Sequence, residues 1–145
     1  PDDLLPLNAR LVHSLPPEAV DMRLKGMGIG DGETFRAAFW LAVRENCQKV
    51  ADASAWWRAI AAPGRVAPAD DDAAYLELAA RLLPDEPFDE GSWSDWTGRL
   101  KAETGRKGRA LFLPLRRALT GLDHGPDMKA LLPLIGRRSS VARLS

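Results

Sequence analysis

The sequence has little of what metal centres and disulfide frameworks require. Its 145 residues include one cysteine, Cys47, and two histidines, His13 and His124. A single cysteine excludes an internal disulfide, and so few thiol and imidazole groups leave no set of ligands for zinc. No nucleophile stands beside a partner base, and no pair of carboxylates is spaced for acid/base chemistry. We therefore expect no metal site, no catalytic residue and a buried, inert Cys47.

Long apolar runs are also missing. No stretch approaches the roughly 20 residues that a transmembrane helix needs. The first residues, Pro1-Asp2-Asp3, lack the basic segment that opens a signal peptide. We expect a cytoplasmic protein without a membrane segment. Its 46% hydrophobic and 28% charged residues are ordinary for a chain that folds around a core.

Strand patterns are absent as well, because β-branched residues are scarce and apolar residues recur every three or four positions. The predicted fold class is all-α. A glycine-rich turn at 26–32 and a linker at 63–68 interrupt the pattern, and the linker divides the chain into two small helical lobes, 1–69 and 70–145. The predicted helices are 4–12, 17–25, 33–50, 55–61, 73–83, 93–103, one within 105–121, 126–135, and a short basic tail helix around 141–144.

Helix ends account for two features that resemble ligand sites. Asp70-Asp71-Asp72 could bind a metal, but three acids directly before a helical pattern favour the positive end of the helix dipole. Ser92 is predicted to cap the next helix, and Gly105 lies just beyond its end. The glycines of 26–32 are predicted to form a connector, since no strand precedes them and the spacing of a dinucleotide loop is not met.

Charge is balanced overall, with 20 basic and 20 acidic residues, but it is unevenly distributed. Residues 99–145 hold eleven Lys and Arg against three acids, an excess of eight positive charges. The first 98 residues carry the opposite excess. Such asymmetry indicates that the C-terminal part binds a polyanion.

The most basic stretch is GRKGRALFLPLRRALTG, residues 105–121, which holds five basic residues and no acid. On a helical wheel Leu111, Leu115 and Leu119 share one apolar arc, with Phe112 at its edge. Pro114 is predicted to kink this helix or to mark its first regular turn. A glycine-rich approach to a helix favours phosphate binding, and the basic candidates for phosphate contact are Arg106, Lys107, Arg109 and Arg117. A solvated basic face on an ordinary core helix explains the same stretch equally well.

The aromatic residues also have two possible roles, base stacking and core packing. Trp93, Trp96 and Phe112 could stack on unpaired bases, although core packing is the more common role of such residues. Trp40, Trp56 and Trp57 are predicted to lie in the core or between the lobes.

These motifs, taken in order, resemble a known family. Gly105–Gly121, followed by Gly125-Pro126 and by LLPLIGR at 131–137, is similar to the C-terminal anticodon-binding region of bacterial glutamyl-tRNA synthetases. Upstream, Leu7–Leu11 and FWLAVR at 39–44 also resemble that family. The likeness covers essentially the whole chain, and the PLRxALTG element is its specific part.

The resemblance implies an all-helical anticodon binder whose parent enzyme ligates glutamate to tRNA-Glu. ATP with Mg and glutamate would bind in the catalytic region, whose HIGH-like and KMSKS-like signatures are absent from this sequence, so we expect no cofactor and no activity in this chain alone. The expected partner is tRNA-Glu, with extension to tRNA-Gln as a hypothesis. We expect a monomer that binds neither DNA nor membranes.

The resemblance also implies particular binding residues. The arginine of PLR, which recognises the third anticodon base in the family, falls on Arg116, and the apolar residue packed beside that base falls on Met128. A second family arginine, which recognises the first base, falls on Asn46. Because asparagine is shorter and uncharged, this departure predicts relaxed recognition of that base. Arg44 lies on the far side of the predicted helix and cannot simply replace it.

Two other classes of function remain open from the residues. One is a helical protein-interaction module whose basic face docks an acidic partner, and steep salt dependence would distinguish RNA binding from it. The other is a helix-turn-helix DNA binder built from the last two helices, although the final helix is short for a major groove.

Overall fold

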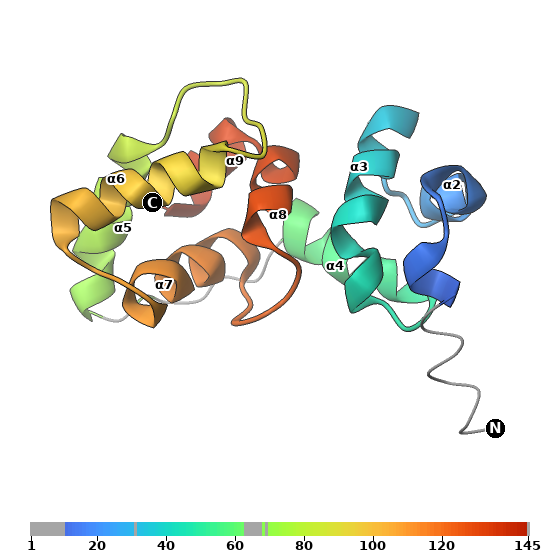
Figure 1. Ribbon diagram of the computed structural model, residues 1–145, viewed down its shortest axis with the longest axis horizontal. Coiled ribbons are helices and arrows are strands. Elements are labelled where there is room, and N and C mark those ends of the chain that lie inside the picture. Colours follow the sequence, from blue (N-terminus) through green and yellow to red (C-terminus); the bar gives the residue numbers. More distant parts are fainter. Residues whose placement is uncertain (1–10, 31, 63–67, 69, 145) are drawn as a thin grey trace. The chain divides into compact units, whose positions relative to one another are not determined.

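The computed structural model describes residues 11–30, 32–62, 68 and 70–144, and every regular element in these ranges is helical (Figure 1). The predicted all-α class is confirmed. The predicted helix at 4–12 lies mostly outside the described residues, while residues 11–14 are helical. In the described part of the chain, no helix is both long and apolar enough to cross a membrane.

The chain divides into two compact units, Pro1–Arg58 and Ala59–Ser145. The predicted boundary between residues 69 and 70 stays a prediction, because residues 63–67 of the predicted linker and residue 69 lie outside the described ranges.

The first unit contains α2 (Pro17–Gly26), α3 (Glu33–Val43), η1 (Arg44–Asn46), η2 (Val50–Asp52) and the beginning of α4 (Ala53–Ala61). α2 packs against α3. The Trp40 indole is fully buried and donates a hydrogen bond of 2.8 Å to the carbonyl of Leu15. Cys47 is buried as predicted. Trp57 forms T-shaped ring pairs with Phe35 and Phe39 and so belongs to the same apolar cluster.

The predicted continuous helix over 33–50 is wrong. α3 ends at Val43, a short 3₁₀ turn follows, and Cys47 is extended, with φ −111° and ψ 135°. The cause lies downstream, where the carboxylate of Asp52 accepts hydrogen bonds from the backbone N–H groups of Gln48 (3.0 Å) and Lys49 (3.2 Å). These bonds favour a new helix start over continuation of the old one.

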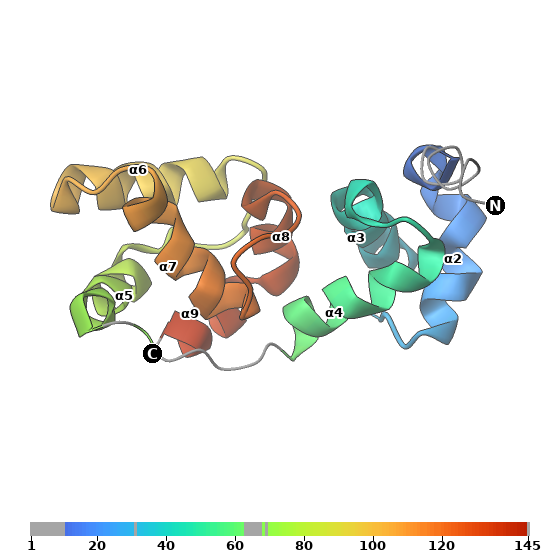
Figure 2. The same ribbon diagram turned by 90° about the horizontal axis from the view of Figure 1, so that it is seen from below.

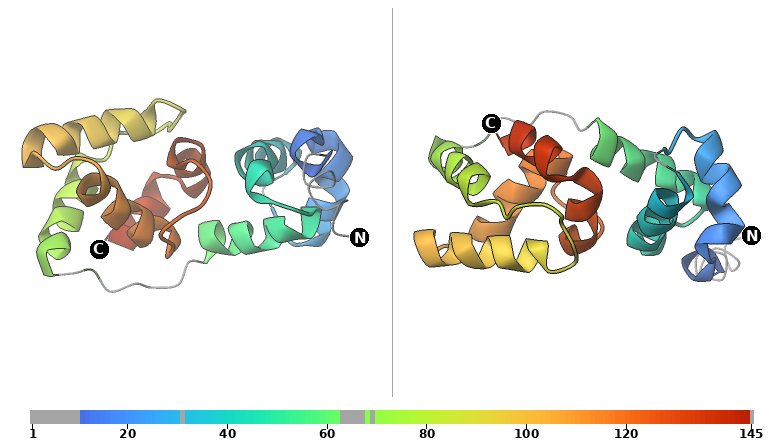
Figure 3. Two further views of the ribbon diagram at one scale, coloured as in Figure 1. Left: turned by 60° about the horizontal axis from the view of Figure 1, so that its bottom comes forward. Right: turned by 90° about the horizontal axis from the view of Figure 1, so that it is seen from above.

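The second unit contains α5 (Asp70–Leu82), α6 (Ser92–Thr104), α7 (Arg109–Thr120), α8 (Met128–Ile135) and α9 (Arg137–Leu144). α6 packs against α5, α7 and α8, and α9 packs against α5, α7 and α8 (Figures 2 and 3). Trp96 lies in this core, fully buried, and its indole donates to the carbonyl of Ala79 at 2.9 Å. Trp96 is therefore a core residue and not a surface for bases.

Of the two predicted ends of α6, one is confirmed and one is wrong. Gly105 ends the helix in the left-handed conformation, with φ 72°. Ser92, however, does not cap it, because Gly91 occupies the N-cap position and Ser92 is the first helical residue. The Ser92 hydroxyl instead accepts a hydrogen bond from the backbone N–H of Asp89 at 2.9 Å.

Candidate functional site

The candidate site is built on α7, whose two faces differ as the helical wheel predicts. Leu111, Leu115 and Leu119 are buried and hold the helix against its neighbours. Residues 112 and 116 lie one turn apart on another face, so Phe112 and Arg116 project together. Phe112 is 42% exposed, which is unusual for a large aromatic side chain.

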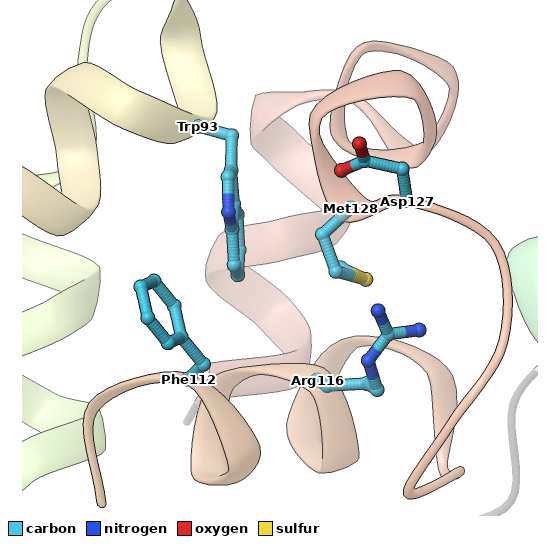
Figure 4. A pocket seen from close by; sticks show the side chains of 5 residues that line it. All are labelled: Trp93, Phe112, Arg116, Asp127 and Met128. Carbon is cyan, nitrogen blue, oxygen red and sulfur yellow. The ribbon is translucent and has the colours of Figure 1, made fainter. Parts of the chain in front are cut away.

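Beside this face lies an open pocket with a volume of ≈ 240 Å³, formed by residues from three helices. Figure 4 shows Trp93 descending from α6, Phe112 and Arg116 rising from α7, and Asp127 and Met128 at the start of α8. The volume lies below the roughly 300–1,000 Å³ of sites for drug-sized ligands. It suits one small planar group.

Two aromatic rings form one wall of the pocket. The rings of Trp93 and Phe112 are stacked, with centroids 6.2 Å apart and an interplanar angle of 29°. The Trp93 ring also forms a T-shaped pair with the ring of the buried Trp96, which anchors Trp93 to the core. Anchored aromatic faces at an open pocket can bind any unpaired base, because each base has a π-face.

Arg116 supplies the positive charge of the pocket. Its Nη1 donates to the backbone carbonyl of Pro126 at 3.1 Å, which orients the guanidinium. Burial lowers the pKa of Arg116, and the nearby carboxylate of Asp127 opposes that shift. A guanidinium carries five N–H donors, and one hydrogen bond from Arg116 to the described residues uses one of them. The other donors suit recognition of acceptors on a base or a phosphate.

The start of α8 completes the pocket. Asp127 caps this helix, since its Oδ1 accepts a hydrogen bond from the backbone N–H of Lys129 at 3.0 Å. Met128 is only 2% exposed and presents the edge of a core side chain to the pocket. The structure thus brings the predicted residues Arg116 and Met128 together. Sequence reasoning missed Asp127, although an Asp directly before a helical pattern is a recognisable cap signal.

A second hollow, ≈ 320 Å³ in volume, adjoins the first and shares Phe112 and Arg116 with it. Its other lining residues are Arg109, Leu113 and Asp123. Asp123 also pairs with Arg117 through two contacts, Nε to Oδ1 at 2.5 Å and Nη2 to Oδ2 at 3.1 Å. The hydrogen bond from Arg117 lowers the pKa of Asp123, so a phosphate would have to compete with a carboxylate for this guanidinium.

The basic residues that are predicted to contact phosphate differ in their surroundings. Lys107 and Arg109 are exposed at the start of α7. Arg106 is held inside the unit instead, with its Nη1 2.8 Å from Oδ1 of Asp72. Contact of these residues with phosphate stays a prediction.

Arg44 and Asn46 belong to the other unit and lie in the 3₁₀ turn η1. Arg44 donates to the carbonyl of Leu15 at 3.2 Å, while the carbonyl of Asn46 accepts from the indole of Trp56 at 3.3 Å. The prediction that these residues stand on opposite sides of one helix is wrong, because α3 ends before them. The side chain of Asn46 is exposed.

Comparison with known proteins places these observations in a family. A family model described as an anticodon binding domain matches residues 60–145. Glutamate–tRNA ligase 2 of Methylorubrum populi is 54% identical over the whole chain, and Glutamate–tRNA ligase 1 of Rhodospirillum rubrum is 45% identical over 99% of it. The chain spans about a third of the length of these relatives, 31% in both.

A solved structure shows the same fold at low sequence identity. The crystal structure of a glutamate tRNA ligase from Elizabethkingia meningosepticum in complex with its amino acid matches 94% of this chain and 30% of that chain. The TM-score is 0.81 at 17% identity, so this likeness concerns the fold alone. The family model covers more than half of the chain, including the whole pocket. The chain therefore belongs to the family of anticodon-binding domains.

Proposed function

We propose that this chain recognises the anticodon of tRNA-Glu as part of a glutamate–tRNA ligase. The family match and the similarity to ligases over the full chain support this proposal. In the proposed parent enzyme, glutamate and ATP with Mg bind outside this chain. The parent works in the cytoplasm as a monomer, and this chain contributes binding of tRNA rather than chemistry.

One observation carries the proposal. The pocket combines a stacked aromatic wall, an oriented guanidinium and an apolar floor in one place, formed by Trp93, Phe112, Arg116 and Met128. An unpaired base needs these three elements, namely a face for stacking, donors for its edge and a surface that excludes water. A protein-interaction surface would need none of the stacking geometry. The excess of positive charge after residue 98 supplies attraction for the phosphates.

We further propose that recognition of the first anticodon base is relaxed. The family resemblance assigns Asn46 to the position of an arginine that recognises an anticodon base. The exposed amide of Asn46 can both donate and accept, so it discriminates between base edges less strongly than a guanidinium does.

The direct test replaces Arg116 by alanine. Arg116→Ala should weaken tRNA-Glu binding by about five- to 150-fold, because a guanidinium that contacts a base is worth about 1–3 kcal/mol. Fluorescence anisotropy of labelled tRNA-Glu measures this loss. Arg81→Ala is the matched control, since Arg81 is an exposed arginine of α5 in the same unit and carries the same charge. Equal losses of tRNA-Glu affinity in the two variants would show that Arg116 contributes only its positive charge and does not recognise a base.

A further inference from the structure

Among the described residues, three groups hold the guanidinium of Arg106, although it lies in the most basic stretch of the sequence. Its Nη1 donates to Oδ1 of Asp72 at 2.8 Å and to the backbone carbonyl of Ala110 at 3.0 Å. Its Cζ lies 4.1 Å from the centroid of the Tyr75 ring. Arg106 therefore ties the segment between α6 and α7 to α5 and to the first turn of α7.

The contact with Ala110 compensates for a proline. Pro114 lies inside α7 and has no N–H, so the carbonyl of Ala110, four residues earlier, lacks its usual helical partner. The guanidinium of Arg106 donates to that carbonyl. On the next residue, the hydroxyl of Tyr75 donates to the carbonyl of Leu111 at 2.8 Å and fixes the same turn to α5.

The geometry requires an arginine. The side chains of Arg106 and Asp72 are only 22% and 25% exposed, and the guanidinium pairs, donates to a carbonyl and stacks at the same time. A lysine ammonium has the charge but no flat face and no fixed fork of donors. The carboxylate of Asp72 also neutralises much of the charge that a phosphate would meet at Arg106.

We propose that Arg106 is a positioning residue, which fixes the start of α7 and so orients Lys107, Arg109 and Phe112 toward RNA without contacting the RNA itself. This inference rests on the proposed function, because the orientation matters only if these residues bind tRNA. It reassigns one of the basic residues predicted to contact phosphate.

The variant Asp72→Asn distinguishes a positioning role of Arg106 from direct phosphate contact, because the two roles predict opposite changes in the affinity for tRNA-Glu. If Arg106 positions α7, Asp72→Asn loosens the start of α7. The loss of one charged hydrogen bond then weakens tRNA-Glu binding by about two- to tenfold. If Arg106 contacts phosphate, the same change releases its guanidinium and strengthens binding. Glu103→Gln is the control for charge, because Glu103 is an exposed acid in the same unit. The control should leave binding unchanged or slightly stronger.

A second variant tests the ordering of α7 directly. The backbone N–H groups of Leu111 and Phe112 donate to the carbonyl of Gly108 at 3.0 and 3.1 Å. Arg106→Lys should raise the hydrogen-exchange rate of these amides in the absence of RNA and should also weaken tRNA-Glu binding, although the charge is retained. Lys107→Ala should weaken binding but leave these exchange rates as in the wild type. Protected amides in α6 report that each variant is folded.

The outcomes distinguish this inference from the proposed function. Stronger binding of tRNA by Asp72→Asn, or unchanged exchange and affinity in Arg106→Lys, overturns the positioning role alone. Failure of the wild-type chain to bind tRNA-Glu overturns the proposed function, and the positioning role with it.

Discussion

Tyr75 and Cys47 are two side chains of the described residues through which stability responds to alkaline pH. Burial raises the pKa of Tyr75 from 10.0 to about 12 and that of Cys47 from 9.0 to about 12. The charge of Arg106 opposes the shift at Tyr75, and Asp72 adds to it. The folded chain thus keeps both protons at pH values where the unfolded chain releases them. Stability is fully present below about pH 9 and is lost as the pH rises toward 12.

Tyr75→Phe tests this prediction. The variant retains the ring beneath Arg106 but loses the hydroxyl that donates to Leu111, so we expect it to be less stable at pH 7 by about 0.5–1.5 kcal/mol. Above pH 10 its free energy of unfolding should fall less steeply than that of the wild type, by at most about 1.4 kcal/mol per pH unit. Urea unfolding at several pH values measures both effects. Parallel curves for the two proteins would show that Tyr75 does not titrate in this way.

Single residues also show which parts of the site the sequence can predict. The family motif identifies Arg116, and the structure brings it beside Met128 in one pocket. The partnership of Arg106 with Asp72 was not predictable, because 34 residues separate them and no local pattern links them. Trp93 and Trp96 have similar local contexts, and only the packing of α6 shows that one lies in the core and the other lines the pocket.

Among the helices, α6 offers two glycines with opposite roles. Gly105 ends the helix with φ 72°, where side chains other than glycine are strained, whereas Gly98 lies in the helix interior. Neither position has another atom within 4 Å of an added Cβ, so the backbone alone decides the effect of alanine.

Gly105→Ala should therefore destabilise the chain by about 1–2 kcal/mol, the cost of a left-handed residue. Gly98→Ala should stabilise it by about 0.5–1 kcal/mol, because alanine favours the helix interior. Thermal and urea unfolding of the two variants provide the measurement, with each variant serving as the control for the other. A shift in the same direction for both would contradict this explanation of the end of α6.

Helix boundaries were predictable where a local signal decides them. Pro16 precedes α2 and Pro17 is its first residue, and the glycines at 105 and 136 follow α6 and α8, as the pattern predicts. The end of α3 at Val43 was missed, because the carboxylate of Asp52 binds backbone groups several residues earlier and so competes with a sequence that otherwise favours helix. Ser92 was predicted as a cap on residue type alone, which does not show which backbone group its hydroxyl binds.

For the molecule as a whole, the uneven distribution of charge agrees with the location of the pocket. The pocket lies in the second unit, Ala59–Ser145, and the positive excess begins at Arg99 in that unit. In the proposed function, the basic residues attract a polyanion to α7, and the aromatic and apolar groups of the pocket distinguish a base from bare phosphate.

The central claim is that this chain distinguishes anticodons, and competition binding tests it most directly. Labelled tRNA-Glu bound to the wild-type chain would be displaced with unlabelled tRNA-Glu, with transcripts altered at one anticodon base each, and with a transcript altered only in the acceptor stem. We predict that a change at the third anticodon base raises the competitor concentration needed by about fivefold or more, that a change at the first base has a smaller effect, and that the acceptor-stem change has no effect. Equal effects of the first-base and third-base changes would contradict only the relaxed recognition of the first base. Equal competition by all transcripts would contradict the central claim, because it would show a basic surface that binds RNA without recognising the anticodon.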